Sequence, residues 1–139
     1  MTAVFTEAVT QHTRSEVVAV GSRARERADE FAGRHTIARA HGSYEALVSD
    51  PDVGAVYVAS PHSEHLEHAL LAIAAGKHVL VEKAFTVNSA EAEQVFEAAH
   101  AAGAVALVVA RDVAGPRIVV PDVLAATGRA QFRDARHFR

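Results

Sequence analysis

The stretch Ala74–Asn88, AAGKHVLVEKAFTVN, decides the fold that this sequence favours, because it joins a helix end, a buried strand and a charged strand end. Gly76 stands where a left-handed residue closes a helix, and a strand is expected at once afterwards, over His78–Glu82. A short apolar run without polar alternation is typical of a parallel sheet covered on both faces. Glu82 and Lys83 then lie at the end where such sheets bind ligands.

Strands and helices alternate on both sides of this stretch. The apolar runs predict strands over Val17–Val20, near Ile37, over Ala55–Ala59 and over Ala104–Ala110. Between them we expect a helix over Thr2–Thr10 with Val4, Phe5, Ala8 and Val9 on one stripe, and helices opened by Ser22, Ser43 and Asn88 or centred on Leu66–Ile73. This order favours an α/β fold with a mostly parallel, doubly wound sheet.

Composition limits the class of protein. The chain has 139 residues, half of them apolar, which suits one domain with a real core. A net charge of -3 with mixed signs gives no basic field for nucleic acid, and the absence of cysteine excludes thiolate chemistry. The longest apolar run, Ala104–Ala110, is too short to span a bilayer, so we expect a cytoplasmic protein.

The pattern changes beyond Arg111, where Gly115, Pro116 and Pro121 interrupt it. A helix-like segment, Asp122–Thr127, ends at Gly128, and the tail that follows is expected to be an edge strand or a linker. The pattern therefore divides the chain into two parts, 1–112 and 113–139. The tail arginines, Arg129, Arg133, Arg136 and Arg139, are interpreted as solvated rather than as a nucleic-acid-binding arm.

Polar residues follow three of the expected strands, and the carboxyl ends of parallel strands meet at one edge of the sheet. They are Ser22 and Arg23, then Ser60, Pro61 and His62, then Glu82 and Lys83. An ammonium group at Lys83 can hold a substrate oxygen or orient a nicotinamide, with Glu82 as the carboxylate that fixes it. The alternative is an ordinary surface lysine.

His62, His65 and His68 recur every three residues, which raises the question of a metal site. A metal is not favoured, because the third histidine turns away along the helix and no second group of ligands is visible. We expect His62 and His65 to donate hydrogen bonds to a ribose or diphosphate oxygen. We expect His68 to lie on the helix surface.

Ser22 and Arg23 stand where an acidic residue would bind the ribose hydroxyls of NAD. A hydroxyl and a guanidinium suit a 2'-phosphate instead, and Arg27 lies one helical turn further on, so NADP is favoured over NAD. The alternative is that the arginines are solvated residues at a helix start. No glycine-rich phosphate loop occurs, since the closest glycines, Gly33 and Gly42, are nine positions apart.

Three motifs together resemble the Gfo/Idh/MocA oxidoreductases. They are VVAVGSR (Val17–Arg23), GSYEALVSDPDVGAVYVASPHSEH (Gly42–His65) and AAGKHVLVEKA (Ala74–Ala84), and the resemblance runs from about Val4 to Gly103. It implies a Rossmann domain that binds NADP or NAD, a second α+β domain for the substrate, and hydride transfer on a sugar, polyol or diol.

The resemblance also assigns residues. Lys83 corresponds to the lysine of the family's Glu-Lys-Pro motif, which lies near the nicotinamide and the substrate. Ser60, Pro61, His62 and His65 match the strand-end segment that faces the cofactor. The Pro61-His62 pair is similar to the dihydrodiol and xylose dehydrogenase branch.

The sequence departs from the family pattern in three places. It begins in the helix that holds Phe5, without the family's central first strand and glycine turn; Ala84 replaces the motif's proline; and it ends where the second domain should start. We therefore expect a chain truncated at both ends, with a partial dinucleotide-binding domain over 1–112 and a linker helix with the beginning of a missing substrate domain over 113–139. The Rossmann-like sheet is then incomplete, and we expect weakened cofactor binding and no activity alone. The alternative is a non-catalytic α/β module that binds a partner or completes its sheet with another chain, for example as a homo-oligomer.

Overall fold

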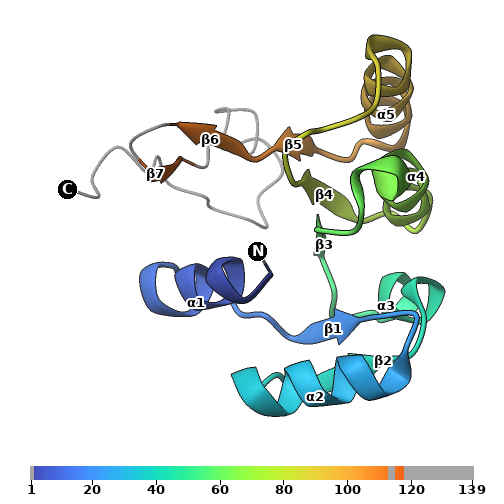
Figure 1. Ribbon diagram of the computed structural model, residues 1–139. Helices are drawn as coiled ribbons and strands as arrows, with labels where there is room; N and C mark the ends of the chain where they lie inside the picture. Colours follow the sequence, from blue (N-terminus) through green and yellow to red (C-terminus); the bar gives the residue numbers. More distant parts are fainter. Residues whose placement is uncertain (1, 113–114, 118–139) are drawn as a thin grey trace.

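The computed structural model describes residues 2–112 and 115–117. Its parallel strands form two separate sheets, as Figure 1 shows. The first pairs β1 (Ala19–Gly21) with β2 (Arg39–His41). The second has the order β3-β4-β5, from β3 (Ala55–Val58), β4 (His78–Val81) and β5 (Ala106–Val108). An antiparallel pair follows, made of β6 (Ala110–Asp112) and β7 (Gly115–Arg117).

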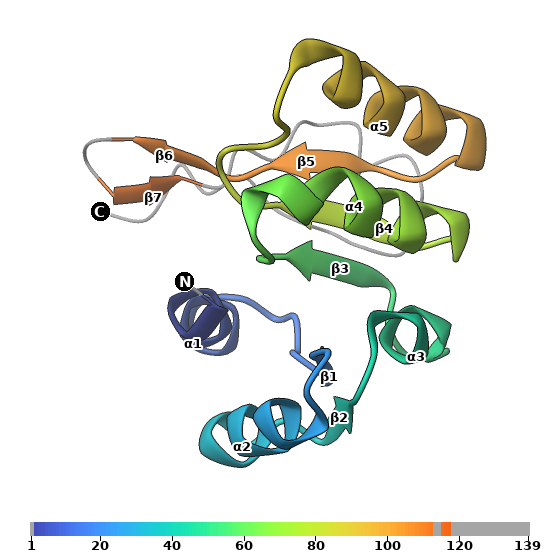
Figure 2. The same ribbon diagram turned by 45° about the vertical axis from the view of Figure 1, so that its right-hand side comes forward.

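One helix precedes the first strand, and the others connect successive parallel strands. In chain order they are α1 (Thr2–His12), α2 (Arg25–His35), α3 (Tyr44–Ser49), α4 (His65–Ala74) and α5 (Ser89–Ala102), with a short 3₁₀ helix η1 (His62–Glu64) before α4. Figures 1 and 2 both show α4 and α5 side by side along the three-stranded sheet. The expected α/β fold with parallel strands is confirmed, and the sheet is divided where the central strand was expected to be missing.

The core lies between this sheet and its two helices. Val56 and Val58 of β3 point toward the same cluster as Val79 and Val81 of β4, and the helices add Ala69, Ala72, Ile73, Val95 and Ala99. Tyr57, between the two β3 valines, faces the other side of the strand. Its ring stacks on Phe5 of α1, with the ring centroids 3.8 Å apart. The second sheet is thus covered by α4 and α5 on one face and by α1 on the other at β3.

Several local signals give the expected boundaries. Ser43 caps α3 by accepting a hydrogen bond from the backbone N–H of Ala46 at 3.1 Å. Asn88 caps α5 by accepting from the N–H of Glu91 at 2.9 Å. Gly76 and Gly103 adopt positive φ angles of 74° and 62°, which close α4 and α5 at low steric cost.

Three expectations need correction. Helix α2 begins at Arg25 with Ala24 as its N-cap, and the Ser22 hydroxyl accepts only from the N–H of Ala24 at 3.3 Å, so it shapes the preceding turn. On α1, Val4 is 56% exposed whereas Thr6 is buried, because the Thr6 hydroxyl is satisfied by donating to the carbonyl of Thr2. The second strand lies at Arg39–His41, after Ile37, whose side chain is buried.

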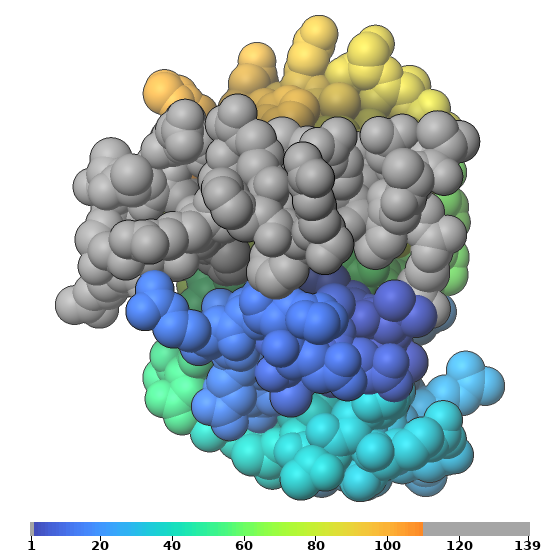
Figure 3. All heavy atoms as spheres, turned by 90° about the vertical axis from the view of Figure 1, so that its left-hand side faces the viewer, coloured from blue at the N-terminus to red at the C-terminus, as the bar shows by residue number. Residues whose placement is uncertain are grey.

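The N-terminal part of the chain is exposed on one face of the molecule (Figure 3). Figure 3 shows blue N-terminal atoms lying on one face of the molecule, next to cyan atoms from further along the chain.

Among residues 2–112 and 115–117, no helix combines the length and apolarity needed to cross a membrane. The helix expected over 122–127, with Gly128 and the tail arginines, lies outside the described residues.

Candidate functional site

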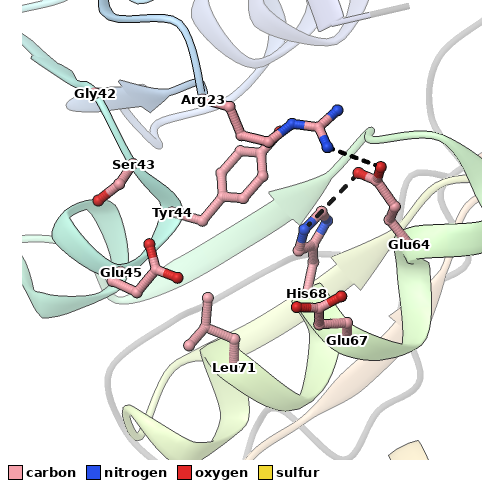
Figure 4. A pocket seen from close by; sticks show the side chains of 9 residues that line it. All are labelled: Arg23, Gly42, Ser43, Tyr44, Glu45, Glu64, Glu67, His68 and Leu71. Atoms are coloured by element: carbon pink, nitrogen blue, oxygen red, sulfur yellow. Dashed lines mark hydrogen bonds and ion pairs between the residues drawn. The ribbon is translucent and has the colours of Figure 1, made fainter.

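A polar cleft lies at the carboxyl ends of β1 and β2 and against the start of α4 (Figure 4). Its volume is about 330 Å³. Arg23, from the turn after β1, and Tyr44, at the start of α3, lie above Glu64 of η1 and His68 of α4. Gly42, Ser43, Glu45, Glu67 and Leu71 complete the lining. The ends of the first three parallel strands therefore contribute to one site, as in other open parallel sheets.

Close packing brings these strand ends together. A Cβ atom added to Gly21, the last residue of β1, would lie only 3.0 Å from the side chain of Leu47 in α3. A side chain at this position would therefore push α3 away from β1. The absence of one lets the loops after β1 and β2 approach each other at the cleft.

A chain of polar contacts crosses the cleft. Arg23 Nη1 donates to Glu64 Oε1 at 2.9 Å, and Glu64 Oε2 lies 3.9 Å from His68 Nε2. On the other side of its ring, His68 Nδ1 lies 2.7 Å from the hydroxyl oxygen of Ser60. These contacts link the end of β1 to the loop after β3. His68 was expected on the helix surface, but its side chain is only 13% exposed and the Tyr44 ring packs edge-on against it.

His65 is buried, with 2% of its surface exposed. Its Nε2 lies 2.9 Å from the carbonyl oxygen of Ser60, and its Nδ1 lies 2.9 Å from that of Ala84 and 3.1 Å from that of Phe85. Carbonyl oxygens only accept hydrogen bonds, so whichever ring nitrogen carries the proton donates to the backbone and not to a ligand. His65 ties together the loops that follow β3 and β4.

Glu82 and Lys83 point in different directions. Glu82 is 8% exposed, and its carboxylate accepts a hydrogen bond from the Tyr57 hydroxyl rather than pairing with Lys83. Lys83 is exposed at the end of β4 and makes no hydrogen bond or ion pair with the residues that the structure describes. The Lys83–Ala84 peptide bond is cis. Lys83 does not line the cleft around Arg23.

The other expected site residues are only partly brought together. Ser22 is half-buried beside Arg23. Arg27 is exposed on α2, outside the cleft, and its guanidinium has no partner within the described part of the chain. Pro61 and His62 are exposed on the loop between β3 and α4. The structure thus gathers Arg23 and the loop after β3 at one cleft, which Lys83 does not line.

A charged cluster that the sequence pattern did not predict surrounds Asp50, which is 7% exposed. Its carboxylate accepts from the Asp52 N–H at 3.0 Å and lies 2.8 Å from Arg39 Nε and 3.1 Å from His41 Nε2. The Asp52 N–H lowers the pKa of Asp50 most; burial opposes this, and His41 and Arg39 lower it further. The Asp50-Pro51-Asp52 motif indicated a turn, but not the partners from β2.

Metal-binding chemistry finds no support in the geometry of the described segments, 2–112 and 115–117. Within them, no three histidine or carboxylate side chains are grouped so that they could hold a metal ion. His65 and His68 instead contact the loop at Ser60, as described above.

Parallel strands joined by helices, with a polar cleft at the strand ends, define the class of nucleotide-binding α/β domains. Within this class, the model of an oxidoreductase family with an NAD-binding Rossmann fold matches residues 1–110. The chain belongs to this family, the Gfo/Idh/MocA oxidoreductases.

Two proteins similar to this chain are dehydrogenases. A D-xylose 1-dehydrogenase (NADP(+)) of Hypocrea jecorina is 50% identical over 92 residues, or 63% of this chain and 24% of that protein. A trans-1,2-dihydrobenzene-1,2-diol dehydrogenase of Bos taurus is 45% identical over 101 residues, or 71% of this chain and 30% of that protein.

A solved structure is similar as well. It is that of KijD10, a 3-ketoreductase from Actinomadura kijaniata in complex with TDP-benzene and NADP, with 38% identity and a TM-score of 0.68. The match covers 73% of this chain and 32% of that one. The chain therefore spans about a quarter to a third of the length of these proteins.

Proposed function

We propose that this chain is the nucleotide-binding part of an NADP-dependent oxidoreductase that transfers hydride to or from a sugar, polyol or diol. The observation that carries the proposal is the cleft at the strand ends, where Arg23 follows β1 in place of an acidic residue. The family membership and the NADP-dependent relatives support the same conclusion.

The cleft fits the ribose-phosphate part of such a nucleotide. Arg23 offers a guanidinium that is 66% exposed at the mouth of the cleft, and a guanidinium binds phosphate through paired N–H groups. Ser22 adds a hydroxyl beside it. Arg27 is assigned a supporting role as a positive charge on α2, because its side chain does not line the cleft.

The carboxyl ends of β3 and β4 would face the rest of the nucleotide and the substrate. Bound NADP would supply the hydride carrier. Lys83 would hold the substrate oxygen with its exposed ammonium group, while Ser60, Pro61 and His62 form the adjacent wall. His65 and Glu82 would act indirectly, because one fixes the two loops and the other is bonded to Tyr57.

The residues present do not fit the pyrophosphate. No two glycines in the 139 residues are close enough to form the turn that lets backbone N–H groups approach it. We therefore propose that the 139-residue chain alone binds NADP weakly and does not turn over substrate.

Calorimetric titration with NADPH and NADH tests this function. Losing the pyrophosphate contacts should leave a Kd for NADPH on the order of 1 mM, about -4 kcal/mol of binding free energy. NADPH should still bind more tightly than NADH, and Arg23→Ala should abolish that difference. Micromolar NADPH binding would refute the proposed weakening. Equal affinity for the two nucleotides in the unsubstituted chain would refute the assignment of Arg23.

A second function is favoured by the divided sheet. In the described part of the chain, β1 pairs only with β2, and β3 pairs only with β4, so each has one open edge. Open strand edges can accept a strand from another chain. The alternative is therefore a non-catalytic module that completes its sheet with a partner, including a second copy. Light scattering across protein concentrations separates the two, because a monomer at every concentration argues against self-completion.

A further inference from the structure

The proposed phosphate ligand already has a competitor inside the cleft. Arg23 Nη1 donates to Glu64 Oε1 at 2.9 Å, so a carboxylate already uses one of the guanidinium nitrogens that could bind a phosphate oxygen. Figure 4 shows the Arg23 side chain directed at Glu64 across the top of the cleft. Two further carboxylates, Glu45 and Glu67, line the same space, so the cleft holds more negative than positive charge before His68 is counted.

The two carboxylate oxygens of Glu64 differ, because Oε1 accepts a hydrogen bond from Arg23 and Oε2 does not accept one from the described residues. Its Oε2 is buried and has no hydrogen-bond partner among the described residues, and the nearest His68 nitrogen is 3.9 Å away. His68 is itself directed toward the Ser60 hydroxyl. A buried carboxylate oxygen without a hydrogen-bond partner costs free energy. Glu64 would therefore be stabilised by moving toward water or by accepting a hydrogen bond from a ligand.

We propose that Glu64 is a specificity-determining residue for the nucleotide. Its carboxylate stands in for the 2'-phosphate on Arg23, and a phosphorylated ribose must displace it. An unphosphorylated ribose offers hydroxyl donors that Glu64 can accept while it stays in place. Glu64 therefore weakens the preference of the cleft for 2'-phosphorylated nucleotides. The cleft then binds nucleotides with and without the 2'-phosphate. This inference rests on the proposed function.

Two small probes test the role of Glu64 without the pyrophosphate site. The probes are adenosine 2',5'-bisphosphate and adenosine 5'-monophosphate, titrated into the 139-residue chain and its variants at constant salt. Removing a like charge next to a bound phosphate should strengthen binding, so Glu64→Gln should raise affinity for the bisphosphate about tenfold. Affinity for the monophosphate should change by less than about twofold.

Glu67→Gln is the matched control. It removes the same charge from the same cleft, but Glu67 does not contact Arg23, so its effect on bisphosphate binding should stay below about threefold. An equal gain in both variants would overturn the proposal, because it would reflect general charge in the cleft. An unchanged or reduced bisphosphate affinity in Glu64→Gln would overturn it too.

The unsubstituted chain provides an independent readout if Glu64→Gln does not fold. The side-chain carboxyl ¹³C resonance of Glu64 should shift on saturation with the bisphosphate and stay in place with the monophosphate. A resonance that responds equally to both probes overturns the displacement. If neither probe binds at millimolar concentration, the proposed function fails together with this inference; if both bind but Glu64→Gln behaves as the unsubstituted chain, only the role of Glu64 fails.

Discussion

His65 illustrates how a residue of a binding motif can act through the backbone. It is buried, and three carbonyl oxygens from the loops after β3 and β4 surround its ring nitrogens within 3.1 Å. Lys83 lies directly before one of these loops. The position of the lysine therefore depends on a histidine that does not reach the cleft.

Replacing this histidine should destabilise the fold. His65→Ala removes a buried ring and leaves carbonyl groups without donors, so we expect a loss of about 2–4 kcal/mol in the free energy of unfolding. Urea denaturation followed by circular dichroism measures it. His62→Ala, at an exposed position on the same segment, should change it by less than about 0.5 kcal/mol. Equal effects of the two substitutions would show that the ring contacts do not hold the loops.

Asp50 contributes to the stability of the folded protein in a way that depends on pH. Its pKa is lowered in the folded protein, first by the Asp52 N–H and then by His41 and Arg39. A lowered carboxyl pKa stabilises the folded state at pH values above the unfolded pKa of about 3.9. That stabilisation is lost as the pH falls from there through the folded pKa.

The substitution Asp50→Asn should therefore destabilise the protein most at neutral pH. The difference in unfolding free energy between the two proteins should shrink as the pH is lowered from about 5 to 3, because Asp50 becomes protonated and neutral as well. Urea titrations at several pH values measure this difference directly. A gap that stays constant over the whole range would show that the ionised carboxylate is not what stabilises the turn.

At the scale of elements, an aromatic contact joins α1 to the second sheet. Phe5 stacks on Tyr57 with their ring planes 11° apart, and Tyr57 in turn donates to the buried Glu82. Helix α1 is short, and helices of this length need tertiary packing to be stable. The contact couples α1 to the end of β4, where Lys83 lies.

Removing that contact should loosen α1. Phe5→Ala should lower the free energy of unfolding by about 1–2 kcal/mol, less than for a fully buried ring, and should raise amide hydrogen exchange in α1. Val4→Ala is the control on the same helix, since its side chain is 56% exposed. Both substitutions raise helix propensity, so equally fast exchange in the two variants would show that the stacking of Phe5 is not what holds α1.

Local signals predicted the elements well, and distant contacts explain the failures. Ser43, Asn88 and Gly103 fix helix ends through groups within four residues, so their roles could be predicted from the sequence. The β2 partners of Asp50 and the β3 partner of Glu82 lie 9 to 25 positions away in the sequence. Such pairings follow from the packing of the sheets and have no local signature.

At the scale of the whole molecule, the candidate site was predictable as a place but not as a set of contacts. The rule that ligands bind at the carboxyl ends of parallel strands brought Arg23 and Ser60 to the same edge. It did not predict that Glu64 and His68 link them, because η1 and the tilt of α4 set those distances. Lys83 follows β4, in the other sheet, and does not line the cleft that Arg23 lines.

Mapping of NADPH binding by amide chemical shifts tests most directly whether this cleft is the nucleotide site. With the ¹⁵N-labelled chain and NADPH at millimolar concentration, the largest shifts should fall on Ser22, Arg23, Ser43 and Tyr44, which lie at the carboxyl ends of β1 and β2. NADH should move the same amides less. Shifts confined to other parts of the chain, or no shifts at all, would contradict the assignment of the cleft as a site for NADP.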